Sequence, residues 1–461
     1  MSVPSKGTIG YGLTMTLDET IRYDRERVST RGERAVVLGA SMAGLLAARV
    51  LNDGYEQVTV VERDALPAGP KTRDGVPQGK HVHVLLEAGR ATISDLFPGY
   101  GEDLIDTGAL IIDVGDELRH YDQGGYLTSP ATRMEMYCAS RPLLETVVRQ
   151  RLAELDGVTI RDDTQFTAYQ VDSDGDRVGG VRVRGDDGIE TLEAEVVVDA
   201  TGRTSRTPAW LAENGYGKPP VEEVEIDMVY STIRVDRPDG DRRMPFVPQS
   251  APRTRGGAAF PVEGGEWLVT LGGMHETDPP TTIEGFLPYA QKLPIEDIEA
   301  ILASREVVSD GVEQYPFPSN RRVRYENLDR FPDGLVVLGD AIASFNPIYG
   351  QGMSVSALEA LTLHETLASS GDGSLGERFF DRATDVVDIA WQMAVGSDAA
   401  FEQTTGPTPP GASMFDTYLS RLVSQAHSDP HLSEAFYRVV GMEVAPTDLF
   451  RPGTIWRTVT P

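Results

Sequence analysis

The run Ala35-Val36-Val37-Leu38-Gly39-Ala40-Ser41-Met42-Ala43-Gly44 decides the fold. A short apolar strand reaches a glycine turn, and residues 45–53 then show a helical pattern that ends at Gly54. A second apolar strand covers Val58–Val61 and closes at Glu62. Strand, turn, helix and strand in this order predict a βαβ unit with parallel strands, so we expect an α/β fold.

The glycine turn has the spacing of a dinucleotide-binding loop, Gly39-x-Ser41-x-x-Gly44, and Glu62 follows 23 residues after Gly39. Gly39 permits the tight turn, and Gly44 lets the helix and the strand pack closely. The free N–H groups of the helix would face a pyrophosphate, and Glu62 can accept from ribose hydroxyls. Ser41 replaces the middle glycine, which weakens the motif, and a glycine-rich turn without a ligand is the alternative interpretation.

Residues 157–200 predict a different kind of sheet. Strand-like segments at 166–171, 177–184 and 190–198 are separated by turns rich in Asp and Gly, which indicates an antiparallel meander. Further strands with alternating patterns follow in residues 221–316. The chain therefore begins a nucleotide-binding fold and then leaves it for a β-rich domain.

Two later motifs return to the nucleotide-binding pattern. An apolar strand at 196–198 runs into the small-residue turn Asp199-Ala200-Thr201-Gly202-Arg203. A second strand ends at Leu338-Gly339-Asp340 and is followed by Pro347-x-x-Gly350-x-Gly352 and a helix. A carboxylate at a strand end can hold ribityl hydroxyls, and a glycine loop that opens a helix presents N–H groups to a flavin ring. Each motif alone is also typical of an ordinary turn.

Taken in this order and spacing, the motifs resemble the FAD-dependent monooxygenases of the p-hydroxybenzoate-hydroxylase-like superfamily, over residues 34–370. The middle motif departs from the Cys-Asp-Gly run of aromatic hydroxylases. It looks more like the flavin-dependent epoxidases of polyether biosynthesis, to which the runs 75–83 and 345–353 are also similar.

The resemblance implies an architecture of interleaved domains. We expect a Rossmann-like FAD-binding domain interleaved with a β-sheet substrate domain, plus C-terminal helices. The predicted boundaries are an N-terminal extension at 1–33, the first part of the FAD-binding domain at 34–220, the substrate domain at 221–320, the return of the FAD-binding domain at 321–370 and a helical region at 371–461.

The resemblance also implies contacts between FAD and twelve residues. They are Gly39, Ser41, Met42 and Gly44 at the pyrophosphate, Glu62 and Arg63 at the adenosine ribose, Arg141 at the start of the second helical stretch, Gly339 and Asp340 at the ribityl chain, and Pro347, Gly350 and Gly352 at the isoalloxazine ring.

Two further features leave alternatives open. His81 and His83 stand two residues apart, and no third or fourth ligand lies near them in sequence, which disfavours a metal site. They are either a hydrogen-bonded structural pair or, by the resemblance, neighbours of the flavin. Apolar residues recur at helical spacing over 415–440, which predicts either helices packed on the core or a lid that collects an apolar substrate.

The resemblance implies a monooxygenase. Reduced FAD would take up O2 to form a C4a-hydroperoxide, which transfers its distal oxygen to an electron-rich alkene or aromatic ring of a small, apolar substrate. We assign no catalytic side chain. NAD(P)H is the expected electron donor, either directly or through a separate flavin reductase.

Three other functions are alternatives to a monooxygenase, and the sequence disfavours them to different extents. A prenyl or isoprenoid reductase, or a dehydrogenase, is the main alternative, although the aromatic run Tyr-x-Trp-x-Phe-Pro of prenyl reductases is absent. A flavin halogenase is disfavoured because the run Trp-x-Trp-x-Ile-Pro is absent. A flavin-binding protein without enzymatic activity is the remaining alternative.

Composition limits the partners and the environment. The chain has 71 acidic and 42 basic residues, a formal net charge of −29. This charge excludes nucleic-acid binding, which needs clusters of Lys and Arg. Only five of the basic residues are lysines, and an acidic, lysine-poor chain is typical of a halophilic protein, because at 1 M salt charges are screened over about 3 Å. An ordinary acidic protein from a GC-rich genome is the alternative.

The remaining composition predicts a folded protein of the cytoplasm. Apolar residues make up 40 % of the chain, enough for a core. The single cysteine, Cys138, excludes a disulfide framework. The sequence shows no signal-peptide pattern and no run of about 18 apolar residues, so we expect a cytoplasmic location and no membrane anchor.

Overall fold

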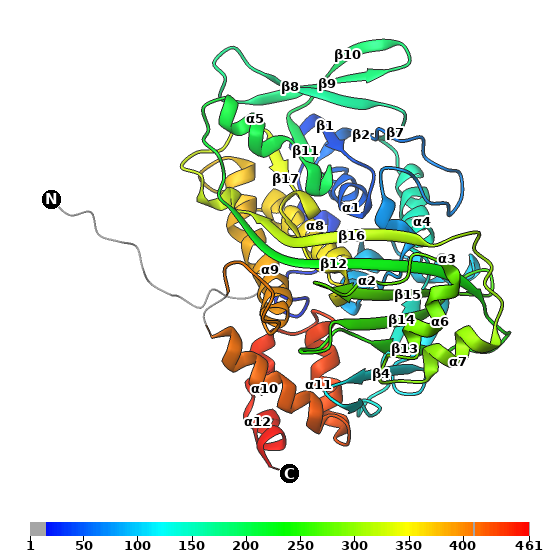
Figure 1. Cartoon of the computed structure of the whole chain (residues 1–461). Coiled ribbons are helices and arrows are strands. Elements are labelled where there is room, and N and C mark those ends of the chain that lie inside the picture. Colours follow the sequence, from blue (N-terminus) through cyan, green and yellow to red (C-terminus); the bar gives the residue numbers. More distant parts are fainter. Residues whose placement is uncertain (1–14, 409–410, 461) are drawn as a thin grey trace.

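The computed structural model describes residues 15–408 and 411–460 and shows two large sheets with helices around them (Figure 1). Residues 1–14 of the predicted N-terminal extension lie outside the described residues. The described part of that extension is attached to the C-terminal region, because the backbone N–H groups of Leu17 and Asp18 donate to the carbonyls of Met442 and Glu443.

The first sheet is parallel, with the strand order β17-β11-β1-β2-β7. Its strands are β1 (Gly32–Leu38), β2 (Tyr55–Val61), β7 (Val158–Arg161), β11 (Val196–Asp199) and β17 (Leu335–Val337). Helix α1 (Met42–Leu51) connects β1 to β2, which confirms the predicted βαβ unit. The helix ends at Leu51 with Asn52 as its C-cap, so the predicted end at Gly54 is too late. The chain turns at residues 52–54, where the Gly54 N–H donates to the Leu51 carbonyl.

A three-stranded antiparallel sheet holds part of the predicted meander. It contains β8 (Gln165–Val171), β9 (Val178–Gly185) and β10 (Gly188–Glu193). The third predicted strand, 190–198, is wrong as a single element. Most residues of β10 are exposed, whereas β11 is fully buried and joins the parallel sheet. Because the two halves lie in different sheets, one strand ends at Glu193 and the next begins at Val196.

The second large sheet has eight strands in the order β18-β16-β12-β15-β14-β13-β4-β5. These are β4 (Leu118–Asp122), β5 (Gly125–Tyr126), β12 (Val221–Asp236), β13 (Met244–Val247), β14 (Arg255–Val262), β15 (Glu266–Met274), β16 (Glu313–Val323) and β18 (Ala343–Ser344). The long strand β12 pairs with β15 and β16 in antiparallel fashion. Strand β4 pairs with β13 in parallel, so residues far upstream of 221 also contribute to this sheet.

Helices cover both large sheets. They are α2 (Glu87–Leu96), α3 (Tyr100–Asp106), α4 (Arg141–Ala153), α5 (Thr207–Glu213), α6 (Phe286–Ala290), α7 (Asp297–Ser304), α8 (Gly352–Ala368), α9 (Leu375–Asp398), α10 (Ala412–Gln425), α11 (Pro430–Val440) and α12 (Pro452–Val459). A two-stranded sheet, β3 (Leu110–Asp113) with β6 (Glu135–Cys138), completes the fold. No helix among the described residues combines the length and the apolar character needed to cross a membrane.

The two faces of the eight-stranded sheet have different neighbours. On one face, Trp267 and Val269 of β15 form an apolar core with Phe286 of α6 and Ile298 of α7. The opposite face lines a large cavity. Helices α10 and α11 form a small apolar cluster of their own beside strands β13 and β4 (Figure 1). The sheet therefore has one face for stability and one face turned toward the cavity.

Candidate active site

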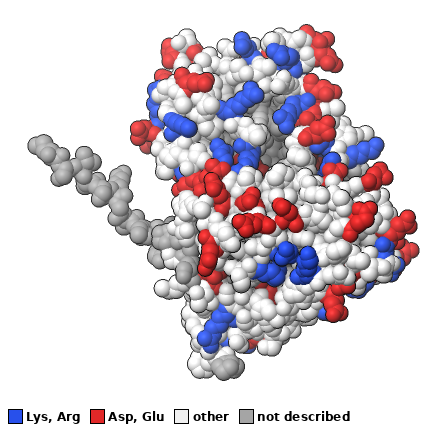
Figure 2. All heavy atoms as spheres, in the orientation of Figure 1, with Lys and Arg blue, Asp and Glu red and all other residues white. Residues whose placement is uncertain are grey.

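One cavity of about 750 Å³ extends from the α1 end of the parallel sheet to the C-terminal helices. Its walls come from the loops after β1 and β11, the start of α8, the eight-stranded sheet and helices α10 and α11. On the face drawn in Figure 2 the surface is hollowed above strands β12 and β16, and basic side chains flank the hollow. The cavity therefore lies between the five-stranded parallel sheet and the eight-stranded sheet.

At the α1 end, two glycines build a tight strand-to-helix turn. Gly39 has φ +102°, a left-handed conformation that favours glycine. A Cβ at Gly44 would lie 1.9 Å from the Gly39 carbonyl oxygen, so no side chain fits there. Ser41 caps α1 in an extended conformation without a side-chain capping bond, and Ser41 and Met42 line the cavity. The free N–H groups of the first turn are therefore available to an anion.

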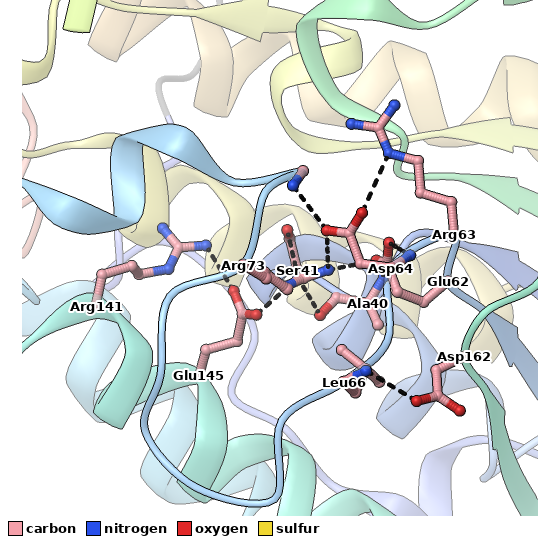
Figure 3. Close-up of polar contacts among 11 residues, drawn as sticks. Ala40, Ser41, Glu62, Arg63, Asp64, Leu66, Arg73, Arg141, Glu145 and Asp162 are labelled. Atoms are coloured by element: carbon pink, nitrogen blue, oxygen red, sulfur yellow. Dashed lines mark hydrogen bonds and ion pairs between the residues drawn. The ribbon is translucent and has the colours of Figure 1, made fainter. Parts of the chain in front are cut away.

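Glu62, at the end of β2, is held by Arg73 (Figure 3). One of its oxygens lies 2.7 Å from Arg73 Nη1 and accepts from the backbone N–H of Ala40 at 2.8 Å. Arg73 Nη2 lies 2.7 Å from Glu145 Oε1 and donates to Ser41 Oγ at 3.2 Å. Burial alone would raise the pKa of Glu62, but Arg73 and two backbone N–H groups hold it below its ordinary value. Arg73 thus joins α1, β2 and α4 in one buried network.

Arg73 was not singled out in the sequence. It lies two residues before the run 75–83, in a loop without periodicity, and no pattern marks it as buried.

Arg63 and Arg141 are two of the arginines that line the cavity. Arg141 opens α4 behind the N-cap Ser140, and its Nη2 donates to Glu145 at 3.3 Å. The Nε of Arg141 is buried and has no partner among the described residues. Arg63 is exposed and contacts only Asp64 loosely, at 3.8 Å. Both guanidinium groups can therefore bind an anion in the cavity.

The start of α8, a helix that packs beside α1, forms a second helix N-terminus in the same cavity. Gly350 has φ +67°, and a Cβ at Gly352 would meet nothing within 4 Å, so open space borders the helix. Pro347, Gly350 and Gly352 all line the cavity, and Gln351 Oε1 is buried without a hydrogen-bond partner in the described part of the chain. This geometry offers backbone N–H groups to a ligand.

Two carboxyl groups with raised pKa values lie at the turn after β17, one in the turn and one on α8. Asp340 projects into the cavity; desolvation raises its pKa, and Arg141 and Arg203 oppose this rise. Behind the turn, burial raises the pKa of Glu359 on α8 to about 8. Glu359 Oε2 accepts from the Gly339 N–H at 2.7 Å. Glu359 is therefore mostly protonated at neutral pH, and its hydrogen bond with Gly339 holds the turn against α8.

A buried carboxylate fixes the loop that precedes α8. Asp398, the last residue of α9, accepts from Asn320 at 2.7 Å, from Asn346 at 3.0 Å and from the Tyr349 hydroxyl at 2.7 Å. Burial raises the pKa of Asp398 to about 6, and these hydrogen bonds oppose the rise. The Tyr230 hydroxyl of β12 donates to Asn346 at 2.6 Å, which connects the loop to the eight-stranded sheet.

The two histidines of the run 75–83 lie on the cavity wall. His81 Nδ1 lies 2.7 Å from Thr232 Oγ1, and His83 Nδ1 lies 3.0 Å from the His81 carbonyl oxygen. Burial lowers the pKa of His81 to about 4 and that of His83 to about 3, so both rings are neutral at physiological pH. Within residues 15–408 and 411–460, no group of three or more His, Cys, Asp or Glu side chains is placed to hold a metal.

Most of the residues predicted to contact a cofactor meet in this cavity. Those that line it are Ser41, Met42, Arg63, Arg141, Asp340, Pro347, Gly350 and Gly352. The other four lie just behind the wall: Gly39 and Gly44 shape the turn, Glu62 binds Arg73, and Gly339 donates to Glu359. Glu62 therefore stands in an ion pair in this structure, and its contact with a ribose remains a prediction.

These residues fit FAD. The cavity brings together two helix N-termini and a buried arginine with an unpartnered Nε, and it leaves open space beside Gly352. Such a donor set suits a pyrophosphate at one end and the carbonyl edge of a flavin ring at the other.

Comparisons with known proteins agree with this geometry. Residues 33–395 match the family model described as an FAD binding domain. The chain is 35 % identical to a Mycobacterium tuberculosis protein named Protein Rv3254 over 437 residues, which cover 89 % of this chain and 90 % of that protein. It is 28 % identical to kynurenine 3-monooxygenase of Salinispora tropica over 384 residues, with 75 % of each chain covered.

Solved structures show the same fold. The flavin-dependent brominase Bmp2 superposes with a TM-score of 0.64, and the match covers 93 % of this chain and 98 % of the brominase at 15 % identity. At that identity the likeness concerns the fold alone. Since the family model spans most of the chain, this protein is an enzyme that belongs to the FAD-binding domain family.

Proposed function

We propose that this protein is an FAD-dependent monooxygenase that inserts one atom of O2 into an alkene or an aromatic ring of an apolar substrate. One oxygen atom enters the substrate, and the other leaves as water with two electrons and a proton from NAD(P)H and one further proton from solvent. One observation carries the proposal. The residues predicted to contact FAD line the same cavity as apolar side chains of the eight-stranded sheet and of helices α10 and α11, and we call this second part of the cavity the chamber.

The chain's own residues bind and orient the groups that react. The N-termini of α1 and α8, with Arg141, would hold the two ends of FAD, and Asp340 would accept from its ribityl hydroxyls. When bound, FAD supplies the redox chemistry that activates O2. Asp398 and Tyr230 fix the loop that would border the flavin ring, and α10 and α11 wall the cavity at its far end, where they would limit the entry of water.

Aromatic and alkene substrates are both supported. The kynurenine 3-monooxygenase relative acts, by its name, as a monooxygenase of kynurenine, which favours an aromatic ring. The likeness of the runs 75–83 and 345–353 to epoxidases favours an alkene. NAD(P)H would reduce FAD directly or through a separate flavin reductase, and the first experiment distinguishes these routes.

The test measures consumption of NADPH, NADH and O2 by the FAD-loaded enzyme with a panel of elongated phenols and alkenes. We expect at least one compound to stimulate NAD(P)H and O2 consumption in equal amounts, with an oxygenated product. Activity that appears only with an added flavin reductase would identify the indirect route. A hydrogenated product without O2 consumption would replace the proposal with a reductase, and absence of turnover on both routes would contradict it.

A further inference from the structure

The cavity-facing side of the eight-stranded sheet forms a continuous floor. Residues that line the cavity from successive strands are Tyr230 on β12, Gly272 on β15, Gly256 and Ala258 on β14, Phe246 on β13 and His120 on β4. The register places them in neighbouring pairs across the sheet, because Tyr230 lies opposite Gly272, Gly256 opposite Gly272, and Phe246 opposite both Ala258 and His120.

This floor has a cofactor end and a far end. Tyr230 contacts the loop before α8, since its hydroxyl accepts from the Ile348 N–H at 3.1 Å. His120 lies four strands away from Tyr230. At about 4.8 Å between neighbouring strands, the floor is about 19 Å long. A substrate that spans it must be elongated.

The roof of the cavity at its far end is mostly apolar, although Asp416 and Ser420 of α10 also line it. Helix α10 contributes Phe415, Leu419 and Val423, and helix α11 contributes Phe436 and Val440. These helices pack into a cluster of their own and also wall the cavity, and a lid role for residues 415–440 stays a prediction. Such walls favour an apolar ligand over a charged one.

His120 is a polar residue of the floor at its far end. His120 is buried, and its ring packs against Phe246 with centroids 4.9 Å apart. Its Nδ1 lies 3.3 Å from the Tyr437 hydroxyl, whereas its Nε2 is buried and has no partner among the described residues. Burial lowers the pKa of His120 to about 4, so the ring is neutral and Nε2 offers one hydrogen-bonding function. A buried polar atom without a partner costs free energy unless a ligand satisfies it.

A second unpartnered group lies along the floor. Gln249 lines the cavity beside Gly256 and Gly272, and its buried Oε1 has no hydrogen bond to any residue that the structure describes. The amide therefore also has capacity for a polar group on the ligand. The cavity thus offers a ligand apolar surface together with two unpartnered polar atoms, His120 Nε2 and Gln249 Oε1.

We propose that the chamber binds an elongated, mostly apolar molecule with a hydroxyl or carbonyl oxygen at the end remote from FAD, and that His120 Nε2 binds this oxygen. The placement of the opposite end at the reaction centre rests on the proposed function. The binding of the polar end does not rest on it, because the geometry of β4, β13 and α11 alone supports that step.

The test uses two probes that differ by one hydroxyl, trans-4-hydroxystilbene and trans-stilbene. Their Kd values for the oxidised, FAD-loaded enzyme are measured by fluorescence titration, with no electron donor present. We expect trans-4-hydroxystilbene to bind about tenfold more tightly than trans-stilbene, the ratio that one buried hydrogen bond produces. His120→Phe should reduce the ratio to about one through weaker binding of the hydroxylated probe alone.

A matched control is His431→Phe, which changes an exposed histidine of α11 and should leave the ratio at its original value. Tyr437→Phe removes the hydroxyl next to Nδ1 and should lower the ratio partially. It also provides the test if His120→Phe does not fold. A ratio that neither variant changes, no preference in the original protein, or no binding of either probe would overturn the inference. Probe binding with the expected ratio but no oxygenation would contradict only the proposed function.

Discussion

At the α1 end of the cavity, Arg73 bridges Glu62 and Glu145 with two contacts of 2.7 Å, whereas at the β4 end His120 Nε2 has no partner among the described residues. Behind the first end the charged side chains pair with one another, whereas at the second end a buried polar atom stands among apolar side chains without a pair. Because Arg73 already satisfies both carboxylates, that network contributes to the folded state itself. The unpartnered group at the other end contributes only when a ligand binds. The difference separates residues that build the protein from residues that select its substrate.

The strongest test of the cofactor end is Gly44→Ala. The added Cβ would lie 1.9 Å from the Gly39 carbonyl oxygen, so β1 and α1 must separate. We expect complete loss of FAD retention during gel filtration. Gly69→Ala, where a Cβ meets nothing within 4 Å, should retain FAD. Retention of FAD by Gly44→Ala would show that the turn is not the binding loop.

The next largest effect is expected for Arg73→Gln. Two buried carboxylates then lose their common partner, which costs about 3–5 kcal/mol in the free energy of unfolding. Urea denaturation measures this loss. The matched variant Arg34→Gln breaks an exposed pair with Glu193 and should cost less than about 0.5 kcal/mol. Equal costs for the two variants would refute the central role of the network.

The Asp398 network predicts a pH dependence. The pKa of Asp398 is about 6 in the folded protein, above its ordinary value of 3.8, so the protonated form is favoured by folding. The stability that this provides is full below pH 3.8 and is lost as the pH rises to about 6, a change of about 3 kcal/mol. Asp398→Asn cannot ionise, so the stability difference between the two proteins should shift by that amount between pH 4 and pH 7 in urea denaturation. Parallel pH profiles would contradict this assignment.

The smallest effect is expected for the dependence of Tm on salt concentration, which compares charges on the surface with charges in the interior. The net charge of −29 is screened strongly at 2 M KCl, whereas the buried Arg73 network is screened little. If the composition reflects a high-salt environment, Tm should rise by about 5 °C between 0.1 and 2 M KCl. The rise should be equal in Arg73→Gln. An unchanged or lower Tm in 2 M KCl would contradict the halophilic interpretation.

The same contrast explains what the sequence alone could predict. The run 35–44 contains a strand, a turn and the start of a helix within ten residues, so its pattern is local and the structure confirms it. His120 acquires its place only because β4 pairs with β13, more than a hundred residues later in the chain. No periodicity within residues 118–122 reveals that pairing.

Two other features depend on distant partners in the same way. The strand predicted at 190–198 is divided because its second half pairs with β1 and β17, and local patterns do not show that choice. Arg73 resembles any loop arginine until Glu62 and Glu145 are brought beside it. Motifs formed by neighbouring residues are therefore predictable, whereas the chamber, built from separate strands and the C-terminal helices, is not.

The most direct test of the central claim is turnover under ¹⁸O2 by the FAD-loaded enzyme with NAD(P)H and, where the indirect route applies, a flavin reductase. The substrates are elongated phenols and alkenes, with trans-4-hydroxystilbene first, and mass spectrometry identifies the products. We expect a product that contains one ¹⁸O atom, with the second atom recovered in water. Hydrogenated products, product oxygen derived from water, or quantitative release of H2O2 with every compound would contradict it.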